Sequence, residues 1–365
     1  MKAVILAGGY ATRLRPISYA LPKLLFPVLG KPMIYLTLDK LESFGVKEVV
    51  LGVNYLANAL QSRVGDRYKG MSIRYSLEDS PLGTAGPIKL ASGATRLDET
   101  FIAVNGDVIA DIDFSKMLKD HHRTRASVTD ALHEVNDPRR FGVVQLGPGN
   151  RIRRFVEKPT LSAAPSRMVN AGIYLIEPEV LRLIPRGRRV SLEREIFPIL
   201  AGKGKLFGFP LSGYWFDVGS FSDYRKANFA LLGRIAGKSV IREKHIRVAK
   251  NASLNAPALV GEFSNIESKA SVGPSVLMGK TSRIMHRAKV SGSILFDGVT
   301  VGEDSIVSGA ILASNVTLGK AVRVGPGSIL SPNIQVADGV KIGKNSIIHP
   351  YKEITANTRP RAHVM

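Results

Sequence analysis

Short apolar runs alternate with amphipathic stretches through the first half of the chain. Buried strands are predicted from these runs at 3–7, 48–53, 72–76, 101–107 and 142–147. Helices are predicted from apolar residues at helical spacing at 32–45, where Gly45 ends the pattern, and at 177–185 and 220–233. Strands that alternate with helices predict a three-layer α/β domain with a mainly parallel sheet, which binds ligands at the carboxyl ends of its strands.

A different period governs the second half, where an apolar residue recurs at every sixth position with two one-residue slips. The series runs through Leu254, Val260, Ile266, Val272, Met278, Ile284, Val290 and Phe296, then Val301, Val307 and Ala313, then Leu318, Val324, Leu330, Val336, Ile342 and Ile348. A six-residue period fits neither a helix nor an array of hairpins. It predicts a left-handed parallel β-helix of hexapeptide repeats, in which each repeat supplies one short strand and one inward side chain.

The change of period divides the chain of 365 residues into two domains. We expect an α/β domain at 1–234, a linker at 235–250 and the β-helix domain at 251–365. The absence of cysteine excludes disulfides, thiolate metal sites and a cysteine nucleophile. No apolar run approaches the roughly 20 residues that span a bilayer, and the N-terminus lacks a cleavable signal pattern. A cytoplasmic protein with no membrane partner is therefore expected.

The formal net charge of +21 favours anionic partners such as nucleotides, sugar phosphates or nucleic acid. The basic residues are spread along the chain, without aromatic interleaving and without a recognisable nucleic-acid module. The charge therefore favours small anions over nucleic acid as the primary partner.

The stretch LAGGYATRLRP, from Leu6 to Pro16, begins in the last two residues of the first predicted strand and continues beyond it. Its small residues would let backbone N–H groups approach a phosphate. It matches neither a dinucleotide fingerprint nor a P-loop, because no third glycine and no Gly-Lys-Ser/Thr follow. Further motifs come in order along the chain: PK at 22–23, EDSPLGTAG at 78–86, NGD at 105–107, EKP at 157–159, NAGIY at 170–174 and WFDVG at 215–219.

In this order the motifs resemble those of the sugar-1-phosphate nucleotidylyltransferases, and most of all the branch called mannose-1-phosphate guanylyltransferases (GDP-mannose pyrophosphorylases). The resemblance covers essentially the whole chain, because it implies a Rossmann-like nucleotidyltransferase domain followed by a hexapeptide β-helix. It implies transfer of a nucleotidyl group from a nucleoside triphosphate to a sugar 1-phosphate, with release of pyrophosphate. Such a reaction brings two anions together, so it depends on cations and positioning more than on a covalent nucleophile.

The resemblance also implies roles for particular residues. Catalytic roles are implied for Arg13 and Lys23 at the phosphates, and for Asp107 and Asp217 as ligands of Mg²⁺. Nucleotide binding is implied for Leu6, Gly8, Gly9, Thr12, Glu78, Gly83 and Asn105, and sugar-phosphate binding for Glu157, Lys158, Asn170 and Gly172. Ala11 stands where the family carries glycine, so we expect the tight turn to survive only if the φ of Ala11 is negative.

Glu78 bears on the choice of base. Thymidylyl enzymes of the family carry glutamine at this place, and glutamine can both donate to and accept from thymine or uracil. A carboxylate only accepts, and guanine presents two adjacent donors, N1–H and N2–H₂. Glu78 therefore favours GTP, and SLEREIFP at 191–198 also resembles the guanylyl enzymes. The alternative is a uridylyl- or thymidylyltransferase that acts on glucose 1-phosphate.

The second half leaves two more alternatives. Many hexapeptide β-helices are acyltransferases with a catalytic histidine, but His286 and His349 stand alone without an acyl-carrier loop, so structural roles are expected for both. The stacked coils offer flat faces, and we expect this domain to assemble a homo-oligomer. A non-catalytic regulatory paralogue would lose the phosphate-handling residues, whereas this chain keeps Arg13, Lys23, Asp107, Lys158 and Asp217.

Overall fold

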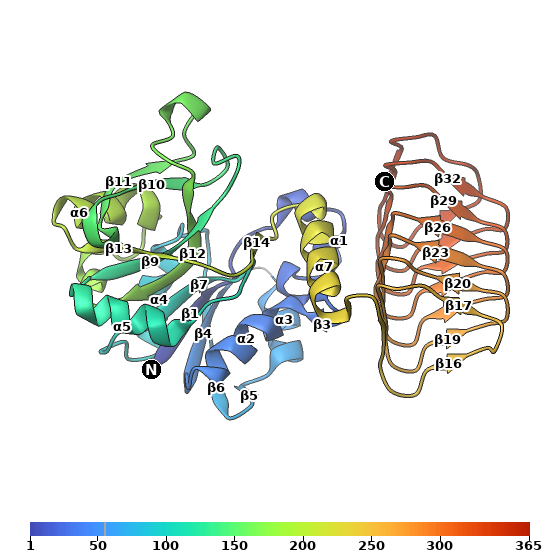
Figure 1. Ribbon diagram of the computed structural model, residues 1–365, viewed down its shortest axis with the longest axis horizontal. Helices are drawn as coiled ribbons and strands as arrows, with labels where there is room; N and C mark the ends of the chain where they lie inside the picture. The colour runs from blue at the N-terminus through green and yellow to red at the C-terminus, as the bar shows by residue number, and fades with distance from the viewer. Residues whose placement is uncertain (55) are drawn as a thin grey trace. The chain divides into compact units, whose positions relative to one another are not determined.

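The structure is a computed structural model that describes residues 1–54 and 56–365. It separates into two compact units (Figure 1). The sheet unit comprises residues 1–10 and 33–218, and the β-helix unit comprises residues 11–32 and 219–365. The short segment 11–32 therefore belongs with the C-terminal half, although it directly follows the first strand in sequence. None of the helices in the described ranges has the length and apolar character needed to span a bilayer.

The sheet unit is built on a mixed sheet that has ten strands within the described residues, in the order β11-β10-β12-β7-β1-β4-β6-β5, with β9 joining β12 to β13. Strands β7, β1, β4 and β6 run parallel, and β12 is antiparallel to β7. The strands are β1 (Lys2–Leu6), β4 (Glu48–Val53), β5 (Arg67–Tyr68), β6 (Met71–Leu77), β7 (Phe101–Asn105), β9 (Val128–Glu134), β10 (Gly142–Leu146), β11 (Ile152–Glu157), β12 (Met168–Ile176) and β13 (Leu206–Pro210), with a separate pair of β8 (Val108–Ala110) and β14 (Trp215–Asp217). The predicted Rossmann-like fold is confirmed.

Helices connect these strands. They are α2 (Met33–Ser43), α3 (Ala57–Val64), α4 (Gly86–Ala94), α5 (Phe114–Thr124) and α6 (Phe197–Gly202), with short helical turns at 148–150, 161–163, 178–183 and 192–196. Helix α4 packs on β1, β4 and β6, and α5 packs on β9, β12 and β13. Strands β1, β4 and β7 are almost entirely buried, which explains why they read as unbroken apolar runs in the sequence.

Three walls of parallel strands form the β-helix, which confirms the predicted fold. Wall 1 holds β15 (Val240–Arg242), β18 (Ala258–Val260), β21 (Val276–Met278), β24 (Ile294–Leu295), β27 (Ile311–Leu312), β30 (Ile329–Leu330), β33 (Ile347–Ile348) and β35 (His363–Val364). Wall 2 holds β16 (Arg247–Val248), β19 (Asn265–Ile266), β22 (Arg283–Ile284), β25 (Thr300–Val301), β28 (Thr317–Leu318), β31 (Gln335–Val336) and β34 (Glu353–Ile354). Wall 3 holds β17 (Ser253–Leu254), β20 (Ser271–Val272), β23 (Lys289–Ser291), β26 (Ile306–Ser308), β29 (Arg323–Val324) and β32 (Lys341–Ile342).

The β-helix unit also contains α1 (Ile17–Ala20), α7 (Phe221–Ala236) and the hairpin of β2 (Pro27–Val28) with β3 (Lys31–Pro32). The stretch 235–250, which we expected to be a linker, contains the end of α7 and the strands β15 and β16. These two strands already pair with β18 and β19 of the next turn, so the β-helix begins at Val240.

The inner core of the β-helix contains the predicted apolar series with two exceptions. At two turns the chain reaches its inward position one residue early, so Leu295 and Leu312 lie in the core where the period predicted Phe296 and Ala313. The placement of Phe296 and Ala313 in that series was therefore wrong. The reason is that register partners in β21, β24 and β27 are seventeen residues apart, whereas β18 and β21 are eighteen apart.

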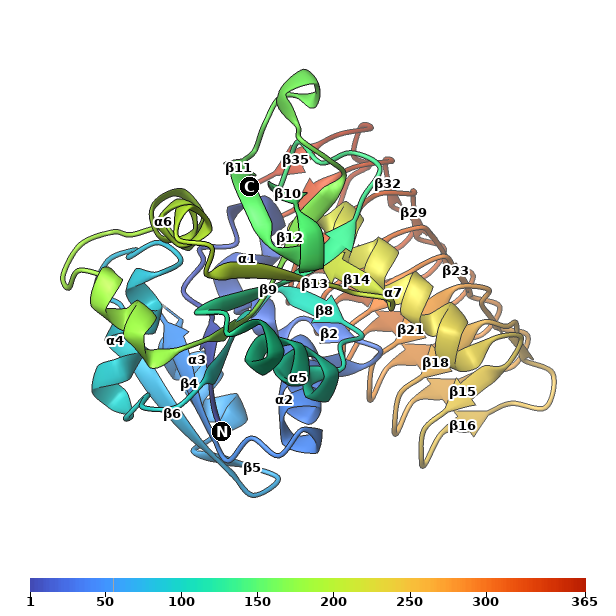
Figure 2. The ribbon, with the colours of Figure 1, turned by 60° about the vertical axis from the view of Figure 1, so that its left-hand side comes forward.

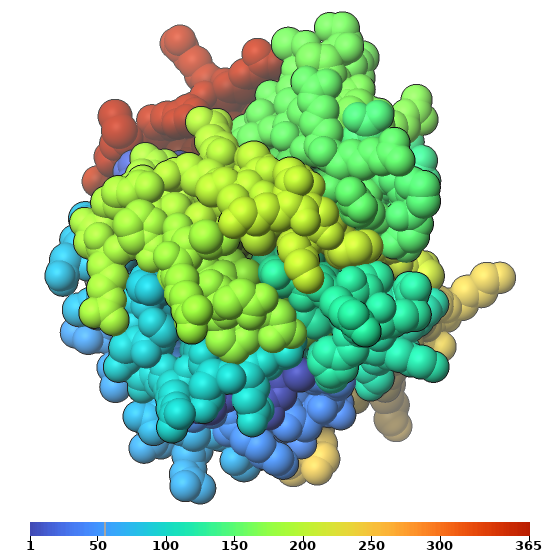
Figure 3. All heavy atoms as spheres, turned by 90° about the vertical axis from the view of Figure 1, so that its left-hand side faces the viewer, coloured from blue at the N-terminus to red at the C-terminus, as the bar shows by residue number. Residues whose placement is uncertain are grey.

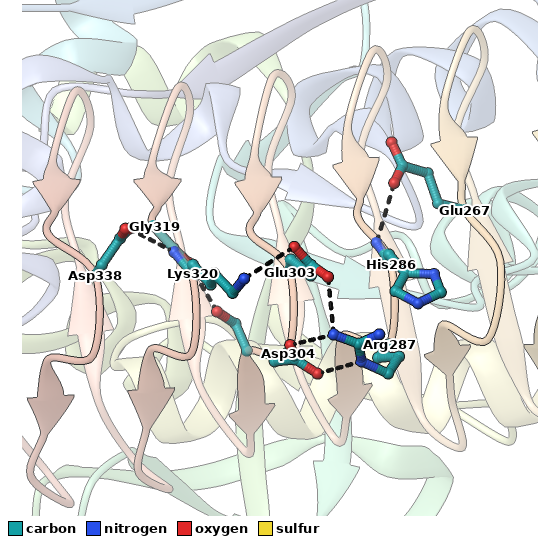
Figure 4. A network of polar contacts seen from close by, with 9 residues as sticks. Glu267, His286, Arg287, Glu303, Asp304, Gly319, Lys320 and Asp338 are labelled. Atoms are coloured by element: carbon teal, nitrogen blue, oxygen red, sulfur yellow. Dashed lines mark hydrogen bonds and ion pairs between the residues drawn. The ribbon is translucent and has the colours of Figure 1, made fainter.

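Polar side chains join successive turns along one edge of the β-helix (Figure 4). The Glu267 carboxylate accepts a hydrogen bond from the His286 backbone N–H (3.0 Å), and Arg287 donates to Glu303 (2.8 Å) and Asp304 (2.6 Å). The Nδ1 atom of His286 lies 2.6 Å from the Ser268 hydroxyl. These contacts place His286 in a ladder that ties neighbouring turns together.

Candidate active site

Strands β1 and β7 end side by side at the point where the strand order reverses. The chain passes from β1 to β4 on one side, whereas β7 lies on the other side of β1. In open α/β sheets, ligands bind outside the carboxyl ends of the strands at such a switch point. The loops that leave these two ends carry Gly8 and Gly9 after β1, and Asp107 after β7. Leu6 and Asn105 are register partners at the two ends themselves.

Gly8 lies against the carboxyl group of Glu78. A Cβ at position 8 would overlap Glu78 Oε1, so a larger residue does not fit this backbone beside that side chain. Asn54, which follows β4, donates a hydrogen bond from its side-chain amide to the Gly8 carbonyl. Gly9 is exposed, and no described atom lies within 4 Å of where its Cβ would be. Gly8 is thus fixed in place, while the backbone at Gly9 is accessible.

The Glu78 side chain is buried, with only 6% of the residue surface exposed. Its Oε2 accepts a hydrogen bond from the Leu82 N–H (3.1 Å), and its Oε1 has no hydrogen-bond partner among the described residues. Burial raises the pKa of Glu78 above its ordinary value, and the Leu82 N–H acts against that shift. A buried acceptor beside Gly8 is therefore suited to a ligand that donates hydrogen bonds.

The loop after Glu78 is clamped to the segment that begins at Val190. Gly83 has a φ of +81° and bridges to Val190, whose carbonyl a Cβ at position 83 would overlap. The Thr84 hydroxyl donates to Glu193 Oε2 (2.5 Å). Figure 3 shows the segment 178–205 (yellow-green) beside the cyan region that contains this loop. The loop that carries Glu78 therefore has a defined path.

Asp107 and Asp217 are brought together by the pairing of β8 with β14. Asp217 is the register partner of Val108, and the Val218 N–H donates to the Asp107 carbonyl (2.9 Å). The backbones of the two residues therefore lie side by side where this ladder ends. One or two carboxylates with phosphate oxygens and water are the usual donors to Mg²⁺. Among the described residues, no group of three or more His, Cys, Asp or Glu side chains could hold a metal ion.

Asn105 and Gly172 face each other from the neighbouring strands β7 and β12. Gly172 has a φ of +73°, and a Cβ there would lie 2.5 Å from Asn105 Nδ2. The Gly172 N–H donates to Asn170 Oδ1 (2.7 Å), and Asn170 Nδ2 donates to the Tyr174 hydroxyl (2.8 Å). The register of β12 shifts between Asn170 and Tyr174. Asn170 and Gly172, both predicted to bind the sugar phosphate, thus lie in one irregularity of strand β12 beside Asn105.

Glu157 and Lys158 lie at the end of β11. The Lys158 side chain is 60% exposed, and its Nζ is 3.5 Å from Glu157 Oε1. Burial, followed by the charge of Glu193, raises the pKa of Glu157. The Lys158 N–H donates to the Phe141 carbonyl (2.9 Å), which fixes the backbone of the lysine. An accessible ammonium group next to a half-buried carboxyl can contact both the phosphate and the hydroxyl groups of a sugar phosphate.

Thr12 and Arg13 lie in the β-helix unit, in the 3₁₀ helix Thr12–Leu14. Ala11 precedes this helix with φ 47° and ψ 39°. The expectation that its φ must be negative was wrong, because Ala11 adopts the left-handed conformation and the turn is still formed. This conformation costs an L-residue about 1–2 kcal/mol of conformational free energy. The Ala11 carbonyl accepts hydrogen bonds from the Leu14 N–H (2.9 Å) and the Ser18 hydroxyl (3.0 Å), which hold the turn.

Lys23 also lies in the β-helix unit, at the start of the 3₁₀ helix Lys23–Leu25. The Arg13 guanidinium lies against Gly219, where a Cβ would be only 2.8 Å from Nη2. Thr12, Arg13 and Lys23 therefore share one segment of the β-helix unit. The other candidate residues belong to the sheet unit.

The sequence of the chain matches the family model of nucleotidyl transferases over residues 2–233. The chain belongs to the nucleotidyl transferase family. Residues 254–364 match the GMPPB C-terminal domain. The mannose-1-phosphate guanyltransferase of Yarrowia lipolytica is 40% identical over 244 residues, which span 66% of each chain and thus just under two thirds of that protein. The enzyme of the same name from Eremothecium gossypii is 38% identical over 330 residues, 89% of each chain.

Among solved structures, HddC from Yersinia pseudotuberculosis complexed with GMP-PN is similar to this nucleotidyl transferase. The TM-score is 0.53 and the sequence identity is 28%, over 63% of this chain and 99% of HddC. The predicted family is confirmed by these matches.

Three residues of this nucleotidyl transferase that shape the site were not predicted. Asn54 directly follows β4, so the rule that pointed to Asp107, a polar residue at the carboxyl end of a parallel strand, could have found it. Thr84 lies in EDSPLGTAG and Glu193 in SLEREIFP, two motifs that were used for their resemblance to the family and not for a role of these two residues. Their hydrogen bond joins residues more than a hundred positions apart, and no local pattern signals it.

Proposed function

We propose that this protein is a Mg²⁺-dependent guanylyltransferase that converts GTP and mannose 1-phosphate into GDP-mannose and pyrophosphate. The observation that carries the choice of GTP is the buried Glu78 carboxyl, whose Oε1 lies beside Gly8 at the carboxyl end of β1. The names of the Yarrowia and Eremothecium relatives support the same pair of substrates.

In the proposed reaction, a phosphate oxygen of mannose 1-phosphate attacks the α-phosphorus of GTP in line. A new P–O bond forms while the bond from the α-phosphorus to the α–β bridging oxygen breaks, and pyrophosphate leaves with that oxygen. No covalent intermediate with the enzyme is needed. The protein therefore contributes positioning and charge stabilisation.

The cationic residues take the phosphate roles in this proposal. Arg13 stabilises the triphosphate and the departing pyrophosphate, Lys23 contacts the α-phosphate, and Lys158 contacts the phosphate of the sugar. Asp107 and Asp217 hold Mg²⁺, which when bound neutralises charge on the α-phosphate. Family resemblance supports these roles, and so do the exposure of the Lys158 side chain and the pairing of β8 with β14.

Small and polar residues complete the two binding sites. The backbone at Gly8, Gly9 and Thr12 surrounds the triphosphate, with Leu6, Gly83 and Asn105 on the nucleoside side. Glu157, Asn170 and Gly172 contact the sugar.

Glu78 reads the base through its two oxygens. Each carboxylate oxygen has two lone pairs, so Oε2 can accept from a second donor beside the Leu82 N–H, while Oε1 is available in full. Guanine presents N1–H and N2–H₂ side by side and matches this pair of acceptors. Thymine and uracil present a single imide N–H between two carbonyl oxygens, and those oxygens would face a carboxylate.

The proposal includes a cytoplasmic location, because GTP is supplied there, and a homo-oligomer assembled through the β-helix. Sedimentation velocity on the full chain measures the oligomeric state, and a monomer at micromolar concentration would contradict this part.

The experiment that tests the function is pyrophosphate release from each pair of one nucleoside triphosphate and one sugar 1-phosphate, with Mg²⁺. GTP, UTP, dTTP, ATP and CTP are combined with the 1-phosphates of mannose, glucose and N-acetylglucosamine. The expected result is one dominant pair, GTP with mannose 1-phosphate. Preference for UTP or dTTP with glucose 1-phosphate would keep the chemistry and overturn the reading of Glu78. No release from any pair would overturn the enzyme and favour a regulatory protein.

A further inference from the structure

One wall of the β-helix differs from the other two on its outer face. Five successive outward residues of wall 1, from β18 to β30, are apolar and at least 93% buried. They are Leu259, Leu277, Ile294, Ile311 and Ile329. The equivalent positions of wall 2 are mostly polar, for example Arg283, Thr317 and Gln335, and those of wall 3 include Lys289 and Arg323. Wall 1 therefore packs against other parts of the chain on its outside as well as its inside.

Two parts of the β-helix unit pack on wall 1. Helix α7 lies against β18 and runs beside the neighbouring strands (Figure 2). The segment 11–32 reaches the same wall, because a Cβ at Gly30 would lie 3.4 Å from the Leu259 side chain. This is the segment that carries Arg13 and Lys23.

A cluster of three rings holds the segment just after Lys23. Phe26 is fully buried and lies edge-on to Tyr224 of α7 (ring centroids 5.8 Å apart) and to Phe296 of the β-helix (5.9 Å). The Tyr224 hydroxyl donates to the Pro27 carbonyl. The backbone after the catalytic candidate Lys23 is therefore fixed by residues about 200 and 270 positions further along the chain.

Hydrogen bonds extend this anchor in both directions. The Leu29 N–H donates to Asn228 Oδ1 of α7 (3.1 Å). Helix α7 is itself tied to the β-helix by Arg225, whose guanidinium donates to the carbonyls of Gly309 and, at 3.3 Å, Gly292 in successive turns. The segment, the helix and the β-helix thus form one connected structure within this unit.

Both ring contacts between the β-helix turns and the segment come from one row of the β-helix. The row consists of the residues that directly follow the six strands of wall 1 from β18 to β33, which are Gly261, Gly279, Phe296, Ala313, Ser331 and His349. Small residues occupy four of these six positions, and the two that carry rings both touch the segment. Phe296 meets Phe26, and His349 meets Tyr19 (ring centroids 6.2 Å apart). His349 therefore has a neighbour that accounts for it without any acyl transfer.

We propose that the β-helix is part of the catalytic machinery, with Phe296 as the main positioning residue and His349 as a second one. Through these rings the β-helix holds the segment 11–32 in the conformation that presents Arg13 and Lys23. This inference rests on the proposed function, which gives those two cations their roles. Loss of these ring contacts would leave Arg13 and Lys23 present but misplaced. Small misplacements of catalytic groups can lower the rate on the order of 100-fold.

The test compares two full-length variants that each truncate one buried side chain of wall 1 or its row. Phe296→Ala removes a ring that touches the segment, and the control Leu330→Ala removes an inward side chain of the β-helix core. Both are assayed for kcat and KM with the best substrate pair, and for hydrogen exchange of residues 11–32. We expect Phe296→Ala to lower kcat about 10- to 100-fold with a smaller change in KM, and to speed exchange in 11–32. Leu330→Ala lowers the melting temperature but leaves both readouts near wild type.

Further variants keep the test decisive if Phe296→Ala fails to fold. Phe296→Leu retains an apolar side chain and should restore most of the rate, and His349→Ala should lower kcat about 2- to 5-fold. Unchanged kcat and unchanged exchange in all three would overturn the proposal, and so would an equal loss of kcat in Leu330→Ala. If the wild type turns over no substrate pair, the proposed function fails, whereas exchange in 11–32 still reports whether Phe296 anchors the segment.

Discussion

The candidate residues of the two units are held in place by different kinds of contact. In the sheet unit, Asn105 and Asp217 stand in strand ladders, and Gly8 follows a strand by two residues. In the β-helix unit, Arg13 and Lys23 lie in short 3₁₀ helices of a segment that is anchored by rings and hydrogen bonds from distant residues. The first set depends on strand pairing within the sheet unit. The second set depends on the C-terminal half, so damage far from Arg13 and Lys23 can reach them.

The largest effect is expected at a ladder-held residue, where only the chemistry is lost. Asp217→Asn keeps the size and the β14 backbone but removes a negative charge from the proposed metal site. We expect kcat to fall at least about 100-fold, with the melting temperature within a degree or two of wild type. Steady-state kinetics with Mg²⁺ and a thermal melt measure both. The control is Asp111→Asn, a half-exposed carboxylate paired with Lys40 nearby, which should retain full turnover. Normal turnover in Asp217→Asn would show that Asp217 is not needed to hold the metal ion.

A smaller, selective effect is expected at Glu78. Glu78→Gln replaces one of two acceptors by a donor, and a matched pair of hydrogen bonds to a base is worth about 1–3 kcal/mol. We therefore expect kcat/KM for GTP to fall about 10- to 100-fold, while kcat/KM for UTP and dTTP is unchanged or higher. Asp79→Asn, at the adjacent exposed carboxylate, serves as the control. An equal loss with all three nucleotides would mean that Glu78 supports its loop and does not read the base.

The pH dependence of GTP binding sharpens the same point. Burial raises the pKa of Glu78, so its carboxylate takes up a proton at a higher pH than an ordinary glutamate with a pKa of 4.5. The ionised form accepts from guanine, so affinity is complete above the raised pKa and falls as the pH drops through it. We expect the KM for GTP to rise several-fold as the pH falls through the raised pKa of Glu78, and we expect this rise to be absent in Glu78→Gln. A parallel rise in the variant would assign the titration to another group.

The smallest effect is expected in the segment itself. Ala11→Gly relieves a left-handed alanine that costs about 1–2 kcal/mol, against an entropic cost of about 0.5–1 kcal/mol for the added glycine. The net gain in the free energy of unfolding is therefore about 0.5–1 kcal/mol, measured by urea denaturation, with kcat changed less than about twofold. A matched Ala59→Gly change inside α3, where the backbone is helical, should instead destabilise by a similar amount. Destabilisation by both substitutions would show that the turn at Ala11 is not strained.

Local patterns predicted the parts of the molecule that local contacts determine. The apolar runs gave β1, β4 and β7 because these strands are buried on both faces, and the six-residue period gave the β-helix because every turn repeats the same packing. Asp107 was chosen as a candidate because the end of a parallel strand is where such a sheet exposes its ligand groups, and the structure places it just after β7.

Contacts between distant residues escaped prediction. Phe296 fitted the apolar period, and a one-residue slip was predicted after it. The register shows that the slip comes before Phe296, which leaves this ring outside the inner core and against Phe26. Glu78 was recognised by its chemistry, but its burial depends on Gly8 and on a loop clamped by Glu193, more than a hundred positions later. In both cases the contact joins residues far apart in the chain, so no short stretch of sequence could have indicated it.

The row that carries Phe296 and His349 sets a fixed distance between these two rings along the β-helix. The two rings are separated by three turns, about 14 Å at the usual strand spacing of about 4.8 Å. Duplication of one repeat turn between them would shift one ring relative to the other by a full strand spacing, and only one could then meet its partner on the segment. A turn added after His349 leaves the distance unchanged. The domain is therefore free to lengthen at its C-terminal end, while the number of coils between the two rings is fixed by a segment that lies near the start of the chain.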